Sequence, residues 1–314
     1  MWIKHNIEQL QLHGMTTLTI GAFDGVHLGH QALIRATVAG AQASCAPATV
    51  LTFEPLPRQV LGNSTAGLLS SLEERLSMFE ALGADGTLVL PFTPELAETS
   101  ADDFVRLLVE QIHLAHLWIG PDFALGKHQE GDARFLQAAS TRYGFQLHVL
   151  DQAVVWRGKP VRSSRIRQAL VQGNLEEANG CLGRPYPLIG EVGHGDQRGR
   201  VLGFPTANLL LPGQKLLPAN GVYVCSAILG RGTFAALVNV GTRPTFDHSH
   251  RTVEAYLLDF SADVYGEQLR LDFLHRLRPE LRFPSAETLI AQMRQDELDG
   301  RAWLRTWQKP HQAS

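Results

Sequence analysis

Short apolar runs alternate with longer stretches of helical spacing over the first half of the chain. The apolar runs predict strands, and the stretches with an apolar residue at every third or fourth position predict helices. The expected strands are residues 15–20, 49–53, 87–91, 117–120 and 146–150, and the expected helices are residues 31–43, 72–82 and 101–113. Strands that alternate with helices are typical of an α/β fold with a mostly parallel sheet and right-handed crossovers. Ligands of such sheets usually bind beyond the carboxyl ends of the strands.

Short β-rich runs separated by glycine, proline and asparagine extend from about residue 184 to residue 283. This pattern predicts an antiparallel barrel or sandwich. The amphipathic stretch at residues 286–307 predicts a helix packed against it. Two short helices, at residues 165–172 and 175–182, are expected to end the first domain. The sequence therefore predicts two domains, residues 1–183 and residues 184–314.

The composition is that of a packed globular protein, with 44% hydrophobic and 19% charged residues among 314. The net charge of -3 gives no global basic field, so we expect no nucleic-acid partner. The first residues lack the apolar core of a signal peptide, and no run of about 18 apolar residues occurs. We therefore expect a cytoplasmic protein that does not enter the membrane. Nothing in the sequence identifies a protein partner.

A glycine-rich turn with two histidines follows the first predicted strand, at residues 21–30. Its glycines allow a ligand to approach the backbone closely, and the start of the next helix offers amide groups to a phosphate. His27 and His30 share one face if both lie in the first helical turn, where they could stabilise charge at an α-phosphorus. A plain turn with structural histidines is the alternative. A zinc site would lack further ligands at suitable spacing, and there is no Walker A signature.

The turn resembles the H-x-G-H signature of the nucleotidylyltransferase superfamily. More narrowly, it resembles the G-x-F-D-G-V-H-x-G-H segment of the prokaryotic bifunctional riboflavin kinase/FAD synthetase family. The resemblance implies a Rossmann-like nucleotidylyltransferase domain that transfers AMP from ATP to FMN and releases pyrophosphate. It also implies that His27 and His30 contact the ATP phosphates. The residues implied to shape the pocket are Gly21, Phe23, Asp24 and Gly29.

Further segments resemble this family in the same order along the chain. Residues 52–55 match its strand-end motif, residues 120–127 resemble G-x-D-F-x-F-G-K, and residues 163–167 resemble S-S-T-R-I-R. The implied nucleotide or substrate contacts are Asp122, Ser163, Ser164 and Arg167. A simple N-cap is the alternative role for Ser163. The chain departs from the family pattern at Leu56, Ala124, Leu125 and Arg165.

A second constellation lies at residues 198–208, which read R-G-R-V-L-G-F-P-T-A-N. Its glycines make the backbone pliable, and its arginines could face phosphate. Thr206 and Asn208 share one face if the segment is extended, and their oxygens are hard ligands suited to Mg²⁺. A plain turn is the alternative. In the later strand pattern at residues 252–260, Glu254 is either a general base for a hydroxyl or a solvent-facing residue.

These segments resemble the riboflavin kinase part of the same family. Residues 199–208 resemble G-R-x-L-G-F-P-T-A-N, and P-x-x-G-V-Y, N-x-G-x-R-P-T and V-E-x-x-L-L-D-F segments follow in order. The implied fold is an antiparallel Greek-key β-barrel with a C-terminal helix. The resemblance implies that Thr206 and Asn208 hold Mg²⁺ and ATP, and that Glu254 takes the proton of the riboflavin 5′-hydroxyl. The remaining implied nucleotide contacts are Gly199, Arg200 and Gly203.

Three functions are consistent with these patterns. The first is a bifunctional enzyme that phosphorylates riboflavin to FMN and adenylylates FMN to FAD, using ATP in both steps. The second is a riboflavin kinase with an altered or inactive adenylyltransferase domain, which Leu56, Ala124 and Leu125 motivate. The third is a flavin- or nucleotide-binding regulator without turnover.

Overall fold

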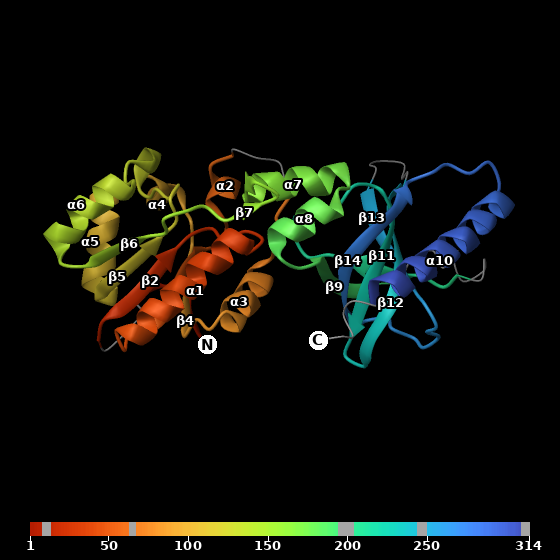
Figure 1. Cartoon of the computed structure of the whole chain (residues 1–314), viewed down its shortest axis with the longest axis horizontal. Coiled ribbons are helices and arrows are strands. Elements are labelled where there is room, and N and C mark those ends of the chain that lie inside the picture. Colours follow the sequence, from red (N-terminus) through yellow and green to blue (C-terminus); the bar gives the residue numbers. More distant parts are fainter. Residues whose placement is uncertain (8–13, 63–66, 194–203, 244–249, 309–314) are drawn as a thin grey trace. The chain divides into compact units, whose positions relative to one another are not determined.

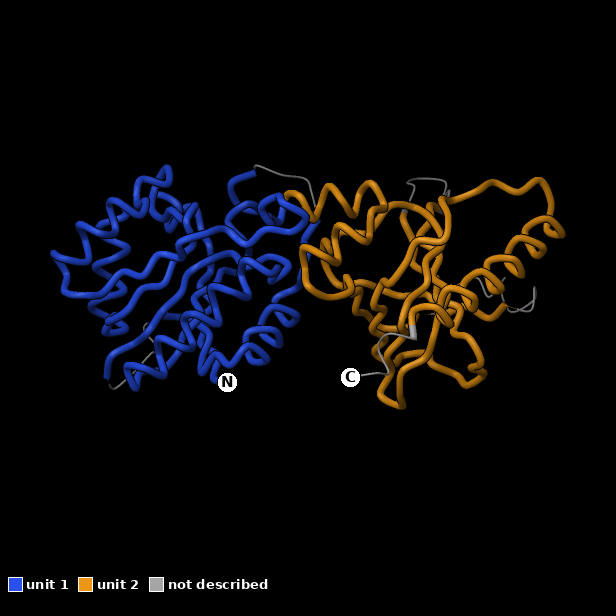
Figure 2. The backbone as a smooth tube through the Cα atoms, viewed as in Figure 1, with its two compact units in different colours: residues 1–163 blue, residues 164–314 orange. Residues whose placement is uncertain are grey.

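The described part of the chain forms two compact units, Met1–Ser163 and Ser164–Ser314 (Figure 2). A computed structural model describes residues 1–7, 14–62, 67–193, 204–243 and 250–308. The first unit is an α/β domain and the second contains a closed β-barrel. The expected combination of a parallel sheet and an antiparallel barrel is therefore confirmed.

A six-stranded sheet in the order β1-β4-β3-β2-β5-β6 forms the centre of the first unit. All of its strand pairs are parallel. The strands are β1 (Trp2–Lys4), β2 (Thr16–Ile20), β3 (Ala48–Phe53), β4 (Gly86–Leu90), β5 (Leu114–Ile119) and β6 (Gln146–Val149). Every residue of β2 and β4 is buried, as expected for strands covered on both faces.

Helices cover both faces of this sheet (Figure 1). One apolar cluster joins the sheet to α5 (Ala101–Ile112) and α6 (Ala133–Tyr143), and another joins it to α1 (Leu28–Ala43) and α3 (Leu72–Ala81). Ser71 is the N-cap of α3 and forms a capping box with Glu74. The shorter elements are α2 (Pro57–Val60), α4 (Pro94–Ala97), the 3-10 turn η2 (Lys127–Gln129) and the strand pair β7 (Val155–Trp156) and β8 (Lys159–Pro160).

The sheet order creates a switch point beside β2. The chain leaves β2 for β3 on one side, and the later strand β5 is added on the other side. At such a point the connections after the two neighbouring strands diverge and leave a crevice at the carboxyl ends. The glycine-rich turn follows β2 directly, and residues 120–123 follow β5. The fold therefore brings these two segments to the same crevice.

Six antiparallel strands form the closed barrel of the second unit in the order β10-β13-β12-β11-β14-β9. The strands are β9 (Tyr186–Gly193), β10 (Ala207–Leu210), β11 (Gly221–Leu229), β12 (Gly232–Arg243), β13 (His250–Leu257) and β14 (Gln268–Pro279). Strands β11, β12 and β13 are sequential neighbours, and β14 returns to lie beside β11. This is the Greek-key order that was expected.

Helix α10 (Ala286–Gln308) packs against the barrel through its C-terminal half (Figure 1). Trp303 and Leu304 contact the apolar cluster formed by Val224, Leu237 and Leu258. Gly300 permits this close packing, because a Cβ atom there would lie 2.6 Å from Leu237 Cδ2. No helix in the described ranges is long and apolar enough to cross a membrane.

Two helices, α7 (Ser163–Gln172) and α8 (Leu175–Leu182), precede the barrel. Asn179 of α8 donates a hydrogen bond from Nδ2 to the carbonyl of Phe273 at 2.9 Å. Its Oδ1 accepts the backbone N–H of Tyr186, also at 2.9 Å. These bonds connect α8 to β14 and β9, so the helix pair groups with the barrel in the division into compact units.

Candidate active sites

A pocket of about 400 Å³ opens at the switch point of the first unit. It is lined by the turn after β2, the first turn of α1, the segment after β5 and the segments that follow β6 and β8. Seven of the expected site residues line it, namely Gly21, Phe23, His27, Gly29, His30, Asp122 and Ser163. The sequence motifs of the first half therefore converge on one cavity.

The two histidines of the turn lie against each other. Their rings stack with centroids 3.6 Å apart and an angle of 17° between the planes. His27 is the N-cap of α1, and its Nδ1 accepts the backbone N–H of His30 at 3.3 Å. The Phe23 ring contacts His30 edge-on at 5.2 Å. The expectation that the two histidines share one face is confirmed, and both lie at the positive end of α1.

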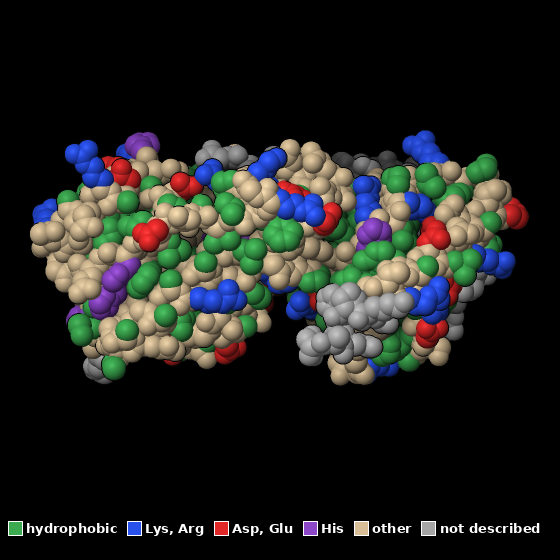
Figure 3. Space-filling view, in the orientation of Figure 1, with side chains coloured by type: hydrophobic (Ala, Val, Ile, Leu, Met, Phe, Trp, Pro, Cys, Tyr) green, Lys and Arg blue, Asp and Glu red, His purple; other side chains and the backbone are tan. Residues whose placement is uncertain are grey.

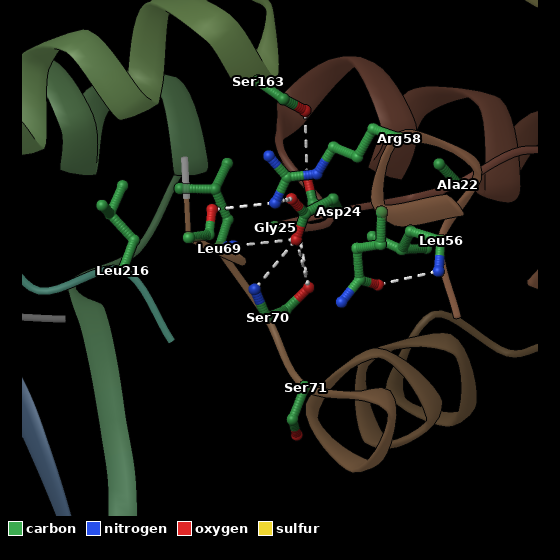
Figure 4. Close-up of polar contacts among 12 residues, drawn as sticks. Ala22, Asp24, Gly25, Leu56, Arg58, Leu69, Ser70, Ser71, Ser163 and Leu216 are labelled. Atoms are coloured by element: carbon green, nitrogen blue, oxygen red, sulfur yellow. Dashed lines mark hydrogen bonds and ion pairs between the residues drawn. The ribbon is translucent and has the colours of Figure 1, made fainter. Parts of the chain in front are cut away.

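Asp24 has a different environment from the histidines. Its side chain is buried, and it is not among the residues that line the pocket. Oδ1 accepts the backbone N–H groups of Leu69 and Ser70 at 2.9 and 3.0 Å, and Oδ2 pairs with Arg58 at 3.1 Å (Figure 4). Ser70 Oγ in turn accepts the N–H of Gly25 at 2.8 Å. The carboxylate therefore attaches the turn to the segment before α3.

Ser163 attaches the same turn from another side. Its hydroxyl donates to the carbonyl of Asp24 at 3.0 Å (Figure 4). Ser164 and Arg167 follow on α7 in the second unit. Arg165, one of the departures from the family pattern, donates from Nε to Glu177 Oε1 of α8 at 2.6 Å. It therefore has a partner within the helix pair.

Arg75 of α3 is a supporting residue that the sequence did not reveal. Its side chain is buried and donates to the carbonyls of Ala22 and Phe53 at 3.2 and 3.1 Å and to Thr52 Oγ1 at 2.7 Å. It also forms an ion pair with Glu54. Burial lowers the pKa of Arg75, and the nearby carboxylates oppose that effect. Arg75 thus connects the segments that follow β2 and β3. The only signal in the sequence was an arginine within an amphipathic helix.

The departures in the first half lie away from the pocket lining. Leu56 and Leu125 are buried, with exposed fractions of 1% and 8%. Leu125 belongs to the apolar cluster under α5 and α6. Ala124 is half-buried beside it. None of the three is among the described residues that line the cavity.

A second pocket, of about 290 Å³, lies in the barrel unit. Thr206 and Glu254 line it, together with Asn239 of β12. Phe204 and Tyr256 form one wall, with their rings edge-to-face at 5.3 Å. The apolar part of the lining comes from β11, β12 and the region of α10: Val222, Leu237, Leu281, Phe283, Leu289 and Met293.

Strand register explains why the polar residues meet. Asn208 of β10 lies directly opposite Glu254 of β13, and Asn239 of β12 lies opposite Glu254 on the other side. Directly opposed residues of antiparallel strands project from the same face, with Cβ atoms about 5 Å apart. The three side chains therefore form a row across the barrel wall, although Asn208 itself is not among the pocket-lining residues. Asn239 is the first residue of the N-x-G-x-R-P-T segment, but no role was predicted for it.

A buried ion pair lies at the edge of this pocket. Arg278 of β14 donates from Nε and Nη2 to the two carboxylate oxygens of Asp296 on α10, at 2.8 and 2.6 Å. Asp296 is buried and also accepts from Gln292 at 2.9 Å. The pair fastens α10 to the barrel. Three expected nucleotide contacts, Gly199, Arg200 and Gly203, lie outside the described residues.

The surface gives no sign of one dominant charge on the face drawn in Figure 3. Basic and acidic side chains are interspersed there over both units. Within the described ranges, no group of three or more histidine, cysteine, aspartate or glutamate side chains is placed to hold a metal ion. Most of the candidate residues gather instead in the two pockets described above.

Comparison with known proteins accounts for both pockets. Residues 9–165 match the FAD synthetase family model, and residues 182–304 match the riboflavin kinase family model. The chain is 37% identical to the bifunctional riboflavin kinase/FMN adenylyltransferase of Escherichia coli K12 over 303 residues, which is 96% of each protein. It belongs to this family. The enzyme of the same description from Haemophilus influenzae is also 37% identical, over 91% of this chain and 94% of that protein.

The family membership fixes the class of reaction. The chain is a transferase of flavin cofactor synthesis, with an FAD synthetase region and a riboflavin kinase region. Riboflavin, FMN and ATP are its substrates, and FMN and FAD are its products. The expected bifunctional assignment is confirmed.

A solved structure has the same fold over nearly the whole chain. It is a crystal structure from Streptococcus pneumoniae described as a macrolide-efflux protein, with a TM-score of 0.87 and 30% identity. The similarity covers 96% of this chain and 98% of that one. The two family matches and the relatives described above agree on flavin chemistry, so the assignment rests on them.

Proposed function

We propose that each reaction of this bifunctional family takes place in one of the two pockets. Adenylylation of FMN belongs to the pocket beside β2, and phosphorylation of riboflavin belongs to the barrel pocket. The observation that carries this proposal is that the two cavities contain different chemical groups. The first contains a stacked histidine pair at a helix N-terminus, and the second contains a carboxylate beside neutral hard oxygen ligands.

In the first pocket, a phosphate oxygen of FMN attacks the α-phosphorus of ATP, and the bond to the leaving pyrophosphate breaks. His27 and His30 donate hydrogen bonds to phosphate oxygens as charge builds up on them. The N-terminal turn of α1 adds its amide groups and its positive potential. Gly21 and Gly29 let the nucleotide approach the backbone, and Phe23 supports His30 from behind.

The other expected residues of this site divide into two roles. Asp24 positions the turn through Leu69, Ser70 and Arg58. Its buried carboxylate already accepts these donors, which favours a supporting role over direct nucleotide binding. Asp122 lines the rim of the pocket. The proposed phosphate contacts at the start of α7 are Ser163, Ser164 and Arg167.

In the barrel pocket, Glu254 is the proposed general base. It takes the proton of the riboflavin 5′-hydroxyl while that oxygen attacks the γ-phosphorus of ATP and ADP leaves. Phe204 and Tyr256 line the same pocket as Glu254, and the apolar part of the cavity suits a flavin ring. Gly199, Arg200 and Gly203 are proposed to contact the nucleotide, as the family resemblance implies.

The donor set of the barrel pocket fits magnesium. Mg²⁺ prefers oxygen ligands and usually takes few from the protein, because it retains waters and binds nucleotide phosphates. Thr206 and Asn208 offer two neutral oxygens next to the Glu254 strand. When bound, the ion would neutralise the charge of the transferring phosphates. These two residues are therefore the proposed magnesium ligands.

The domain boundary and the location complete the proposal. We keep residue 183 as the boundary between the two functional halves, since the riboflavin kinase match begins at residue 182. A cytoplasmic location suits an enzyme that consumes ATP. It also suits the three cysteines, which are not paired in disulfides.

The alternative function is a kinase with an altered adenylyltransferase domain. The residues that suggested this alternative do not line the pocket. Leu56 and Leu125 are buried in the core, and Ala124 is not among the pocket-lining residues. The departures from the family pattern thus act on packing rather than on the contacts of the turn. This observation favours the bifunctional function.

The decisive experiment supplies the purified chain with riboflavin, ATP and Mg²⁺ and separates the flavins by chromatography over time. FMN should form first and FAD should follow. A parallel reaction with FMN and ATP should yield FAD and pyrophosphate. Accumulation of FMN alone would favour the kinase-only reading. Tight binding without any product would favour a regulator.

A further inference from the structure

One ion pair at the rim of the first pocket has no role in the function described so far. Arg162 Nη2 and Asp122 Oδ2 lie 2.6 Å apart. Among the described residues that line this pocket, these two carry its guanidinium and its carboxylate. Asp122 follows β5, whereas Arg162 lies between β8 and α7. The pair therefore joins two separate walls of the cavity.

The backbone of Arg162 is fixed on both sides although its side chain is exposed. Val161 is buried, and its N–H donates to the carbonyl of Val154 at 2.9 Å. Ser163 is attached to Asp24 at 3.0 Å. The Arg162 and Asp122 side chains are 61% and 71% exposed. The guanidinium can therefore change partner while its Cα atom keeps its position beside the histidine turn.

The energetics argue against a structural role for this pair. An ion pair between two exposed side chains contributes little to folding, because water screens the charges. A nucleoside triphosphate brings several negative charges, and arginine binds phosphate through two parallel N–H donors. A guanidinium stays charged at every physiological pH. Arg162 is thus the permanent positive charge of the described pocket lining.

We propose that Arg162 binds the phosphates of ATP in the adenylyltransferase pocket, and that Asp122 is the competing partner it leaves when the nucleotide enters. This inference rests on the proposed function of that pocket. The exchange replaces one carboxylate by phosphate oxygens and breaks no covalent bond. It places a phosphate-binding arginine immediately before Ser163, at a position that the motif at residues 163–167 does not include.

The first test measures FAD formation from FMN at varied ATP concentrations. The variant Arg162→Gln should raise the KM for ATP by about 10- to 100-fold, the usual effect of losing a hydrogen bond to a charged group. Inhibition by added pyrophosphate should weaken by a similar factor, because the lost contact is to phosphate rather than to adenosine. Arg162→Lys should restore part of the affinity.

A matched control replaces an arginine of another exposed ion pair in the same unit. Arg106 pairs with Asp103 at 2.5 Å on α5 and does not line the pocket. Arg106→Gln should leave the KM for ATP unchanged. Riboflavin phosphorylation by the same preparations should also be unchanged, and an unchanged melting temperature of each variant would show that its first unit is folded.

The second test examines the competition itself. Asp122→Asn should lower the KM for ATP by about two- to fivefold, since the weak ion pair no longer opposes the nucleotide. In the Arg162→Gln background the same change should alter the KM by less than about twofold. A higher KM for Asp122→Asn in both backgrounds would show that Asp122 binds substrate directly, and would overturn the competition.

The inference and the proposed function fail in different ways. Absence of FAD with the unaltered chain would refute the adenylyltransferase assignment itself. Normal FAD formation with the same KM for ATP and the same pyrophosphate inhibition in Arg162→Gln would refute the role of Arg162 alone.

Discussion

The two pockets of this enzyme are built by different means. The pocket beside β2 is formed largely by one continuous turn, whose shape depends on three polar supports: Asp24, Arg75 and Ser163. The barrel pocket is formed across strands, where register brings together Asn208, Asn239 and Glu254. A continuous turn depends on the groups that hold its backbone, whereas a cross-strand row depends on the closure of the barrel. The two sites should therefore respond differently to substitution.

The largest effect is expected from Glu254→Gln. Loss of the general base should reduce riboflavin phosphorylation by about 10²- to 10⁴-fold, while FMN adenylylation is retained. The measurement is FMN formation from riboflavin and, separately, FAD formation from FMN. Glu191→Gln is the matched control, because Glu191 is an exposed residue of β9 outside the pocket. Equal loss of both reactions would contradict the assignment of one reaction to each pocket.

His27→Asn should affect the other reaction. Asparagine is a good N-cap, so the start of α1 is preserved while the imidazole is lost. We expect FAD formation from FMN to fall by about 10²- to 10³-fold, with riboflavin phosphorylation unchanged. An unchanged rate would mean that His27 acts only as the cap of α1. His27→Ala, which removes both features, would then identify any structural effect by its lower thermal stability.

Arg75→Met should show the dependence of the first pocket on its support. The substitution leaves the carbonyls of Ala22 and Phe53 and the hydroxyl of Thr52 without this donor. We expect a loss of about 3 kcal/mol in stability of the first unit. After mild heating, FAD synthesis should decay faster than FMN synthesis. Arg106→Met, at an exposed site, should behave like the unaltered chain, and equal decay in both variants would contradict a supporting role.

The smallest expected effect is a loss of folding stability at acid pH, to which one histidine in each unit contributes. Burial, followed by the charge of His116, lowers the pKa of His148, and burial lowers the pKa of His275. The unfolded chain takes up these protons below about pH 6.5, whereas the folded chain resists them. Stability is therefore lost as the pH falls from the unfolded towards the folded pKa. His148→Gln should reduce the slope of melting temperature against pH between about 7 and 5.

A control substitution and a measurement on the barrel unit make this test more specific. His128→Gln alters an exposed side chain and should leave the slope unchanged. His275 stacks on Trp303 at 5.0 Å, so its titration in the barrel unit can be followed through tryptophan fluorescence. A slope that remains the same in His148→Gln would show that His148 does not govern the acid sensitivity of the first unit.

The sequence by itself determined the class of both units and most of the first pocket. Periodicity separated the parallel sheet from the barrel, because each element must bury its apolar face with its own spacing. The turn at residues 21–30 could be identified because its glycines, histidines and helix start are consecutive. Such a site depends on local geometry, and local geometry follows from local sequence.

The tertiary structure alone decided which distant residues act together. Arg75 and Ser163 support the histidine turn from far along the chain, and Asn239 joins Glu254 only through strand register. Asp24 is held inward by the segment before α3, although its place in the motif suggested a pocket-lining residue. Arg162 acquires its partner Asp122 because the segment after β5 lies beside the segment that follows β8. Contacts of this kind arise from the closure of the sheet and the barrel, which no short segment of the sequence encodes.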